Sequence, residues 1–430
     1  MNTSLPQSEL RAKLLAIEPL LNAIAIFILS TIFLFWDASR AVYVLLSLAA
    51  LVFVVKYRPQ MPRDHRLYSW PIIGYVGATT LSVLFNGLTD SGINSLGSKI
   101  FLLLIAIPLV SIFYLSFDLK RNIWIKFAVG CMVMGGLALV DILFLDIYRA
   151  SGGHNSARFG FVALAMTSVV IASYHRFSQV RFGRFVYFLA ILMGVCAMIL
   201  SGTRTAWFAG FAVLVIATFF YLDRYSLSRR ILITLTLIGG IAIVGSSLPI
   251  VQKRIGQMIE IAMPYAKGDE QTEFTSLRIR VELWKLAWHV GMEDKVFGYG
   301  PGNTKRVIKD YAQQNPHLKR LEKTAHIHNQ FLQTFAMSGL VGLFSFLALL
   351  ICHFWIFAKY LSKKYSLEVR CLALSGLLLL VAYLIKSIPG VPFYGKQYLL
   401  MYGFASASIW GCLLGALRES GPVANKLVDD

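Results

Sequence analysis

The stretch that decides the fold of this 430-residue chain is AHIHNQFLQTFAMSGLVGLFSFLALLI, residues 325–351. It begins with polar residues and continues as an apolar run, and a helix needs about 20 mostly apolar residues to cross a bilayer. The change from polar to apolar therefore predicts the edge of a membrane. His326 and His328 stand at that edge, and histidine is the side chain whose ordinary pKa lets it take up a proton near neutral pH.

Apolar runs of similar length fill most of the remaining sequence. They are centred near residues 27, 47, 79, 107, 134, 166, 192, 213, 239, 377 and 407. Charged residues make up 15% of the chain, whereas soluble domains have about 25%. With the run after His328, we predict an all-α polytopic membrane protein of about twelve transmembrane helices. The run Leu20–Trp36 is long and lacks a small-residue cleavage site, so we interpret it as an uncleaved first span.

Basic residues gather in the loops on one side of these runs, and in membrane proteins that side is the cytoplasmic one. The loops of this set contain Lys56, Arg58, Arg63, Arg66, Lys120, Arg121, Arg176, Arg181, Arg184, Arg224, Arg229, Arg230, Lys359, Lys363, Lys364 and Arg370. The opposite short loops hold far fewer. We therefore expect both termini in the cytoplasm, and we interpret the net charge of +19 as a topology signal rather than a sign of nucleic-acid binding.

One polar segment, from about Ser246 to Ala325, is too long to be an ordinary connection. It contains 13 basic and nine acidic residues, and Ile279, Leu283 and Trp284 recur in it at helical spacing. We expect a partly helical loop domain outside the cytoplasm. The predicted division is residues 1–245 for spans one to nine, 246–325 for the loop, 326–418 for spans ten to twelve and 419–430 for a cytoplasmic tail.

The start of this segment, residues 250–263, has an apolar face beside Lys253 and Arg254. Such a pattern is typical of a helix that lies in the membrane interface, and an ordinary surface helix fits it equally well. A segment with net positive charge would attract anionic head groups.

A short turn on the same outer side contains SGTRTAW, residues 201–207. Because the turn has few residues, we expect Arg204 at the membrane edge, where an ionisable residue is costly and by default functional. Glycine and small residues beside it would let a ligand approach closely. The alternative is that Arg204 reaches a lipid head group and only anchors the helix.

The long loop holds two further candidate segments. In SLRIRVELW, residues 276–284, Arg280 and Trp284 would share one face of a helix because they are four residues apart. The alternative for Arg280 is a salt bridge to Glu282 or a neighbouring acid. In FGYGPGN, residues 297–303, three glycines make a tight turn whose backbone N–H groups could approach an anion.

Taken in order, these segments resemble the signature of the bacterial O-antigen ligase (WaaL) family, which shares a domain with O-antigen polymerases. The resemblance rests on His328-Asn329 followed by Gly339 and Gly342, on SGTRTAW, and on RVELW followed by FGYGPGN. It covers roughly residues 190–345, while the N-terminal third agrees only as a series of apolar spans. It implies a GT-C-like glycosyltransferase architecture that works without a metal or another cofactor.

An enzyme of this family would transfer a polysaccharide from undecaprenyl diphosphate to a sugar of the lipid A core, with inversion, on the periplasmic face of the Gram-negative inner membrane. His328 would then take the proton from the acceptor hydroxyl. Arg204 and Arg280 would bind the diphosphate, because a guanidinium binds phosphate oxygens bidentately. The other candidates for substrate binding are His326, Asn329, Arg278, Arg158 (or Arg149), Trp284 and Lys386.

Two details refine this hypothesis. The chain has no Asp-x-Asp triplet, so we expect arginine rather than a divalent ion to neutralise the leaving group. His326 and His328 are two residues apart, and on a helix they would point to different faces. Only His328 is therefore expected to be essential.

Other functions compete with this hypothesis. Within the same class, the alternatives are an O-antigen polymerase and an O-oligosaccharyltransferase. In another class, the alternative is a flippase or transporter for a lipid-linked glycan. Transporters tend to have internal repeats and ionisable residues near mid-membrane, whereas Asp141 and the other charged candidates lie near span ends. Membrane lipids are expected partners of either class, and the oligomeric state stays open.

Overall fold

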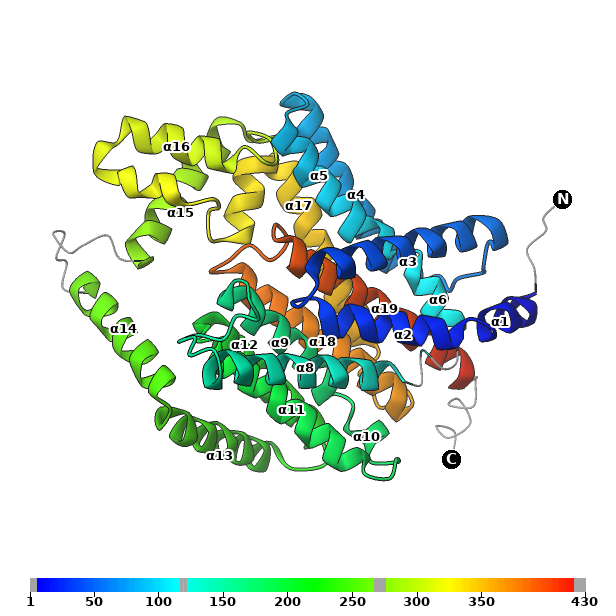
Figure 1. Ribbon diagram of the computed structural model, residues 1–430. Helices are drawn as coiled ribbons and strands as arrows, with labels where there is room; N and C mark the ends of the chain where they lie inside the picture. The colour runs from blue at the N-terminus through cyan, green and yellow to red at the C-terminus, as the bar shows by residue number, and fades with distance from the viewer. Residues whose placement is uncertain (1–5, 117–118, 120–121, 267–275, 421–430) are drawn as a thin grey trace.

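A computed structural model describes residues 6–116, 119, 122–266 and 276–420 of the chain. These residues form helices joined by loops, and they contain no β-strand (Figure 1). The helices are α1 (Gln7–Leu15), α2 (Glu18–Thr31), α3 (Trp36–Tyr57), α4 (His65–Phe85), α5 (Asp90–Leu102), η1 (Leu104–Ala106), α6 (Leu109–Leu115), α8 (Ile123–Leu143), α9 (Ser156–Ile171), α10 (Tyr174–Phe177), α11 (Gly183–Leu200), α12 (Arg204–Tyr221), α13 (Leu227–Ser246), α14 (Pro249–Ala266), α15 (Ser276–Glu293), α16 (Thr304–Gln314), η2 (Pro316–Lys323), α17 (Gln330–Lys359), α18 (Leu367–Ser387) and α19 (Lys396–Ser420).

Ten helical segments of the described residues are long and apolar enough to cross a membrane. An eleventh is added if α1 and α2, which meet at 65°, form one bent span. The all-helical prediction is confirmed, and the predicted number of twelve spans is not. The remaining predicted span is α9, which has only 16 residues and is buried over most of its length. A helix enclosed by other helices has no lipid-facing surface that must match the bilayer thickness.

The helix α19 lies at the centre of the bundle. Its most apolar 18-residue window is completely buried, and it packs against α6, α18, α5 and α9. Around it, α8 packs against α9 and α11, and α17 packs against α4. By contrast, only 6% of the corresponding window of α13 is buried, and α13 lies at the edge of the bundle beside α14 (Figure 1). The outer surface of α13 is therefore available to lipid.

The ends of the helices form two faces of the bundle. At one face, α8, α11, α13 and α18 end and α9, α12, α17 and α19 begin. This face carries the segment between α13 and α17, and we call it the loop face. Both ends of the described chain lie at the opposite face, away from α15 and α16 (Figure 1).

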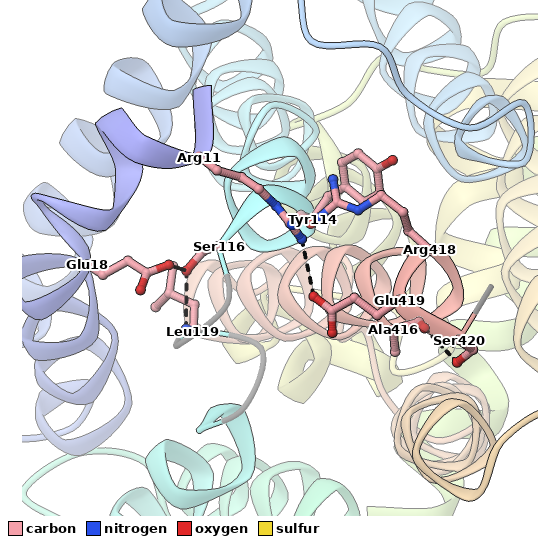
Figure 2. A network of polar contacts seen from close by, with 9 residues as sticks. All are labelled: Arg11, Glu18, Tyr114, Ser116, Leu119, Ala416, Arg418, Glu419 and Ser420. Carbon is pink, nitrogen blue, oxygen red and sulfur yellow. Dashed lines mark hydrogen bonds and ion pairs between the residues drawn. The ribbon is translucent and has the colours of Figure 1, made fainter. Parts of the chain in front are cut away.

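At the opposite face, α1 is tied to the end of α19 (Figure 2). Arg11 donates a hydrogen bond to Glu419 at 3.2 Å. The neighbouring Arg418 donates to the carbonyl oxygen of Tyr114 at 3.4 Å, and its guanidinium carbon lies 4.5 Å from the centre of the Tyr114 ring. The first and the last described helices thus share one polar network.

The segment between α13 and α17 has a small hydrophobic core of its own. Leu283 and Leu286 of α15, Ile308 of α16 and Leu321 of η2 are buried in it. Ile327, between the two histidines, is fully buried in the same core. Because α15 also packs against α17, this core fixes the segment to the bundle.

The helix α17 is interrupted at Gly339, whose φ of 63° and ψ of −162° are accessible essentially to glycine alone. The FGYGPGN turn docks at this break. The backbone N–H groups of Tyr299 and Gly300 donate to two carbonyl oxygens of α17, each at 3.0 Å. A Cβ atom on Gly339 would lie 2.1 Å from the carbonyl oxygen of Val296. These two N–H groups therefore attach the loop to α17 and are not free to approach an anion.

Candidate active site

A cavity of about 570 Å³ lies at the loop face. Its wall is formed by the starts of α9, α12 and α19, the end of α18, parts of α14 and α15, and the residues just before α17. The cavity therefore unites the SGTRTAW turn, the helix that contains RVELW and the HIHN segment, which are far apart in the sequence.

Six cationic side chains line this cavity, and none of the described residues in its wall is acidic. The cations are Arg149, Arg158, Arg204, Arg254, Arg280 and Lys386. Like charges collected without counter-charges repel one another, and a bound anion relieves that repulsion. The charge and the planar donor groups fit a polyanion such as a diphosphate.

The turn between α11 and α12 is built by one glycine and two arginines. Gly202 has a φ of 60°, the left-handed conformation that commonly ends a helix. The Nε of Arg149 donates to the carbonyl oxygen of Ser201 at 2.9 Å, and the Nε of Arg254 donates to that of Gly202 at 3.0 Å. Both carbonyls belong to the end of α11, where cations are favoured by the helix dipole. Arg204 begins α12 directly after this turn.

Two arginines of the cavity wall that lie outside the spans have lowered pKa values. Burial, together with the charges of Arg254 and Arg204, lowers the pKa of Arg149. Burial lowers the pKa of Arg280. Arginine nevertheless stays protonated in proteins, so both groups contribute full positive charge.

The proposed alternative partner of Arg280 is engaged elsewhere. Glu282 forms a salt bridge with Lys285 at 3.0 Å. No salt bridge joins Arg280 to an acid within the part of the chain that the structure describes. Its charge is therefore left for the cavity.

Neutral side chains hold two other cations of the wall. Lys386, which is 7% exposed, donates to the hydroxyl oxygen of Thr205 at 3.0 Å. Arg158 donates to the amide oxygen of Gln397 at 3.2 Å. Because these partners carry no charge, they orient the cations without neutralising them.

His326 and His328 both face this cavity. Their ring centroids are 4.1 Å apart, and the rings meet edge to face at 67°. The two residues precede α17 in a non-helical segment, while Ile327 between them is buried in the loop core. The prediction that the two histidines point to different faces is therefore wrong, because the segment is not a helix.

The backbone of His328 is strained. Its φ of 59° is uncommon for a residue other than glycine. Such a conformation costs about 1–3 kcal/mol and persists only where the surroundings enforce it. Here Ile327 is anchored on one side, and Asn329 caps α17 on the other by accepting two backbone N–H groups of its first turn. These neighbours hold the His328 ring in the cavity wall.

The cavity keeps both imidazole rings neutral. Burial lowers the pKa of His328 to about 3, with His326, Arg280 and Lys386 adding to the effect. Burial also lowers the pKa of His326 to about 4, and the charges of Lys386, Arg158 and Arg280 contribute. A neutral imidazole has one nitrogen able to accept a proton. An anion bound among the arginines would raise both pKa values, because it offsets the positive charge.

Three predicted substrate-binding residues lie outside the cavity wall. Asn329 is engaged as the helix cap. Trp284 packs against the loop core. Arg278 is half-buried on α15 but does not contribute to the described wall. The structure thus brings together Arg204, Arg280, Arg158, Lys386 and both histidines.

Arg254 is a cavity residue that the sequence analysis did not select. It lies on α14 together with Met258, which also lines the cavity. A separation of four residues puts two side chains on one helix face, so the amphipathic pattern of residues 250–263 held a usable signal. Tyr394 and Tyr398 also line the cavity, and no sequence pattern marked them.

Residue types that often act in catalysis or metal binding, namely cysteines and acidic residues, have no such arrangement among the described residues outside the cavity. The described residues contain no group of three or more His, Cys, Asp or Glu side chains placed to hold a metal ion. The five cysteines are free thiols in helices. Asp141 accepts the backbone N–H groups of Ser151 and Gly152 at 2.6 and 2.8 Å, and it therefore shapes the loop before α9.

The middle of the chain matches a known family. Residues 188–347 match the family model described as O-antigen ligase. The chain carries an O-antigen ligase family domain. The domain runs from α11 to just beyond the break in α17. It supplies Arg204, Arg254, Arg280, His326 and His328 to the cavity, and the cations of α9, α18 and the loop before α9 come from outside it.

Two relatives extend this comparison. An uncharacterized protein of Haemophilus influenzae is 23% identical over 355 residues, which are 79% of this chain and 85% of that protein. The teichuronic acid biosynthesis protein TuaE of Bacillus subtilis is 25% identical over 109 residues, which are 25% of this chain and 21% of that protein. The chain thus covers about a fifth of TuaE. The matched domain thus lies in a chain whose described residues include ten helical segments long and apolar enough to cross a membrane.

Proposed function

We propose that this protein is an O-antigen ligase, which transfers a polysaccharide from undecaprenyl diphosphate to a sugar hydroxyl of the lipid A core. The observation that carries the proposal is the cavity whose wall holds six cations, two neutral histidines and no acidic residue among those described. A diphosphate is the part of such a donor that these cations would bind. The family match at residues 188–347 supports the same reaction class.

The proposed reaction exchanges one bond for another. The acceptor oxygen attacks the anomeric carbon of the donor sugar, the bond from that carbon to the diphosphate oxygen breaks, and the diphosphate leaves with the electron pair. One imidazole nitrogen of His328 takes the proton of the acceptor hydroxyl. Attack from the side opposite the leaving group inverts the anomeric centre. A positioned base of this kind is typically worth about 10²–10⁴-fold in rate.

The arginines would stabilise the charge that develops on the leaving diphosphate. Removing one key donor to such a charge typically costs about 10²–10³-fold in kcat. Arg204 and Arg280 are the proposed principal donors, and Arg254 joins them because it lines the same wall. This assignment needs no divalent ion for neutralisation.

The site also suits substrates that arrive within a bilayer. The cavity lies at the loop face, where several spans end, so a lipid tail could remain in the membrane while its diphosphate reaches the cations. We propose that the loop face is periplasmic, that both termini are cytoplasmic and that the membrane is the inner membrane of a Gram-negative cell. The concentration of basic residues in the loops of the opposite face supports this orientation.

A polymerase is the second candidate. It is favoured by the likeness to the teichuronic acid biosynthesis protein TuaE. A polymerase would use the same donor site and differ in its acceptor, which would be a second lipid-linked glycan.

One transfer assay separates these functions. The purified protein in nanodiscs receives undecaprenyl-diphosphate glycan with either lipid A-core or no second acceptor, in the presence and absence of a chelator. The ligase proposal expects product on lipid A-core, and the chelator should leave the rate unchanged. Elongated diphosphate-linked glycan without lipid A-core product would identify a polymerase. Loss of activity with chelator would contradict neutralisation by arginine alone.

A further inference from the structure

A second cavity lies beside the cationic one at the loop face. It has a volume of about 280 Å³ and lies between the first turns of α5 and the start of α19. Four polar side chains of α5 contribute to its wall, together with the apolar Phe393 and Leu399 and the amines of Lys99 and Lys396; the four are Ser91, Asn94, Ser95 and Ser98. Groups of this kind exchange hydrogen bonds with sugar hydroxyls.

Lys99 provides the only deeply buried charge in this wall among the described residues. It is 6% exposed, and it lines both this cavity and a smaller polar space next to it. Its ammonium lies 5.6 Å from the centre of the Tyr75 ring. Within the described part of the chain, this ammonium has no carboxylate partner. A buried ammonium without a counter-charge favours an anionic ligand, because the ligand supplies the missing charge.

Tyr394 separates the two cavities. It contributes to the wall of both, and it belongs to the loop between α18 and α19. The backbone N–H of Phe393, the residue before Tyr394, donates to the side-chain amide oxygen of Gln330 in the first turn of α17 at 2.9 Å. His328 lies two residues before Gln330 and lines the cationic cavity. A molecule in the second cavity would therefore reach the base by passing Tyr394.

We infer that the second cavity binds the acceptor glycan and that Lys99 pairs with an anionic substituent on it, a phosphate or a carboxylate. This inference rests on the proposed transferase function and names the site of its second substrate. The cationic cavity then holds the donor diphosphate, the second cavity holds the acceptor sugars, and the hydroxyl that reacts lies between them at Tyr394.

The test measures the Michaelis constants of both substrates for the full-length protein in nanodiscs. Lys99→Met keeps the length of the side chain and removes its charge. We expect it to raise the acceptor KM about tenfold, because one charge-assisted contact is lost, and to leave the donor KM within about twofold. Lys99→Arg should restore part of the acceptor affinity. An unchanged acceptor KM, or an equal rise in both constants, would overturn the inference.

The acceptor itself supplies a second arm. Lipid A-core whose anionic substituents are removed by phosphatase or neutralised by amidation of carboxylates should bind the wild type as weakly as intact lipid A-core binds Lys99→Met, and the substitution should then add nothing, as in a double-mutant cycle. Core oligosaccharide freed from lipid should compete with the acceptor. Competition by lipid A without core sugars, but not by the free oligosaccharide, would assign the cavity to a lipid phosphate and overturn its assignment to glycan.

A third arm avoids the buried lysine and does not depend on turnover. Asn94 is exposed and lines the cavity, whereas Ile93 is exposed beside it and does not. Asn94→Trp should weaken binding of labelled core oligosaccharide, measured without donor, and Ile93→Trp should not. If the wild type fails to transfer glycan, the proposed function fails, while this binding measurement still decides the inference. If Asn94→Trp and Ile93→Trp bind the labelled core oligosaccharide equally well, the second cavity is not the acceptor site.

Discussion

The rings of His326 and His328 lie 4.1 Å apart on one wall of the cavity, while Ile327 between them is buried in the loop core. Replacing His328 should therefore do two things at once, removing a base and releasing a strained backbone. We expect His328→Ala to lower kcat by about 10²–10⁴-fold. His328→Gly should be as inactive, although glycine accepts the φ of 59° without strain.

His326 provides the comparison for that measurement. His326→Ala should reduce the rate less, and the double variant should be no slower than His328→Ala, because two rings in contact do not act additively. Steady-state transfer at matched protein abundance measures all four variants. Full turnover by His328→Gly would show that His328 is not the base.

The acidic limb of the pH profile follows from the lowered pKa values. A base works only while it is neutral, so activity falls when the pH drops below its pKa. Because the pKa of His328 is lowered to about 3, we expect kcat/KM, which reports the free enzyme, to stay level from pH 8 down to about pH 5. The acidic fall of kcat should occur at a higher pH, because a bound diphosphate raises the pKa. A single histidine titration of kcat/KM near pH 6.5 would contradict this.

Arg204 should not be replaceable by lysine. Lysine keeps the charge but lacks the planar fork that binds two phosphate oxygens. We expect Arg204→Lys to lose about tenfold or more in kcat/KM, which corresponds to one charge-assisted hydrogen bond. Arg306→Lys, on the exposed surface of α16, is the matched control and should be unchanged. Normal transfer by Arg204→Lys would instead support a role in anchoring.

Arg254 and Lys253 form a pair of neighbours with different surroundings. Arg254 lines the cavity, whereas the Lys253 ammonium lies 4.2 Å from the centre of the Tyr148 ring. Arg254→Gln should raise the donor KM about tenfold, because a charged contact to the diphosphate is lost. Lys253→Gln removes the same charge from α14 and should have little effect. Equal losses in both variants would mean that α14 acts only through its net charge.

The break at Gly339 should be sensitive to a single methyl group. Gly339→Ala places a Cβ 2.1 Å from the carbonyl oxygen of Val296 and cannot keep the backbone angles. We expect a lower thermal unfolding temperature and faster proteolysis between α15 and α17. Gly136→Ala is the control, because a Cβ there meets nothing within 4 Å. If both variants unfold like the wild type, the docking of the loop on α17 is not needed for stability.

The sequence was sufficient to predict the class of fold and several residues of the site. It was not sufficient to predict where helices are interrupted or which distant residues meet in one cavity. Apolar runs near 20 residues mark helices that need a lipid or protein interior, so the positions of most spans were predictable. The continuity of these helices was not predictable, because the break at Gly339 accompanies the docking of the FGYGPGN turn on α17. The residues Arg204 and Arg280 were selected individually, yet nothing in their separation of 76 positions indicates that one cavity contains both.

The histidine pair shows why local reasoning failed at the centre of the site. The prediction assumed that the helix includes His326 and His328. In the structure Asn329 caps the start of α17, and the residues before it take a non-helical path because Ile327 is buried in the loop core. Tertiary anchoring of Ile327 overrides local propensity here. Arg254 was missed because amphipathic spacing alone does not tell which surface a helix faces.

The complete burial of α19 has a consequence for biosynthesis. The helices that enclose α19 are synthesised before it. Until α19 is inserted, the surfaces of these helices that contact it in the folded protein have no partner. The cationic cavity, whose wall includes the start of α19, is assembled only at that moment. An incompletely translated chain therefore lacks the complete cationic cavity, and under the proposed function it could not consume an activated glycan.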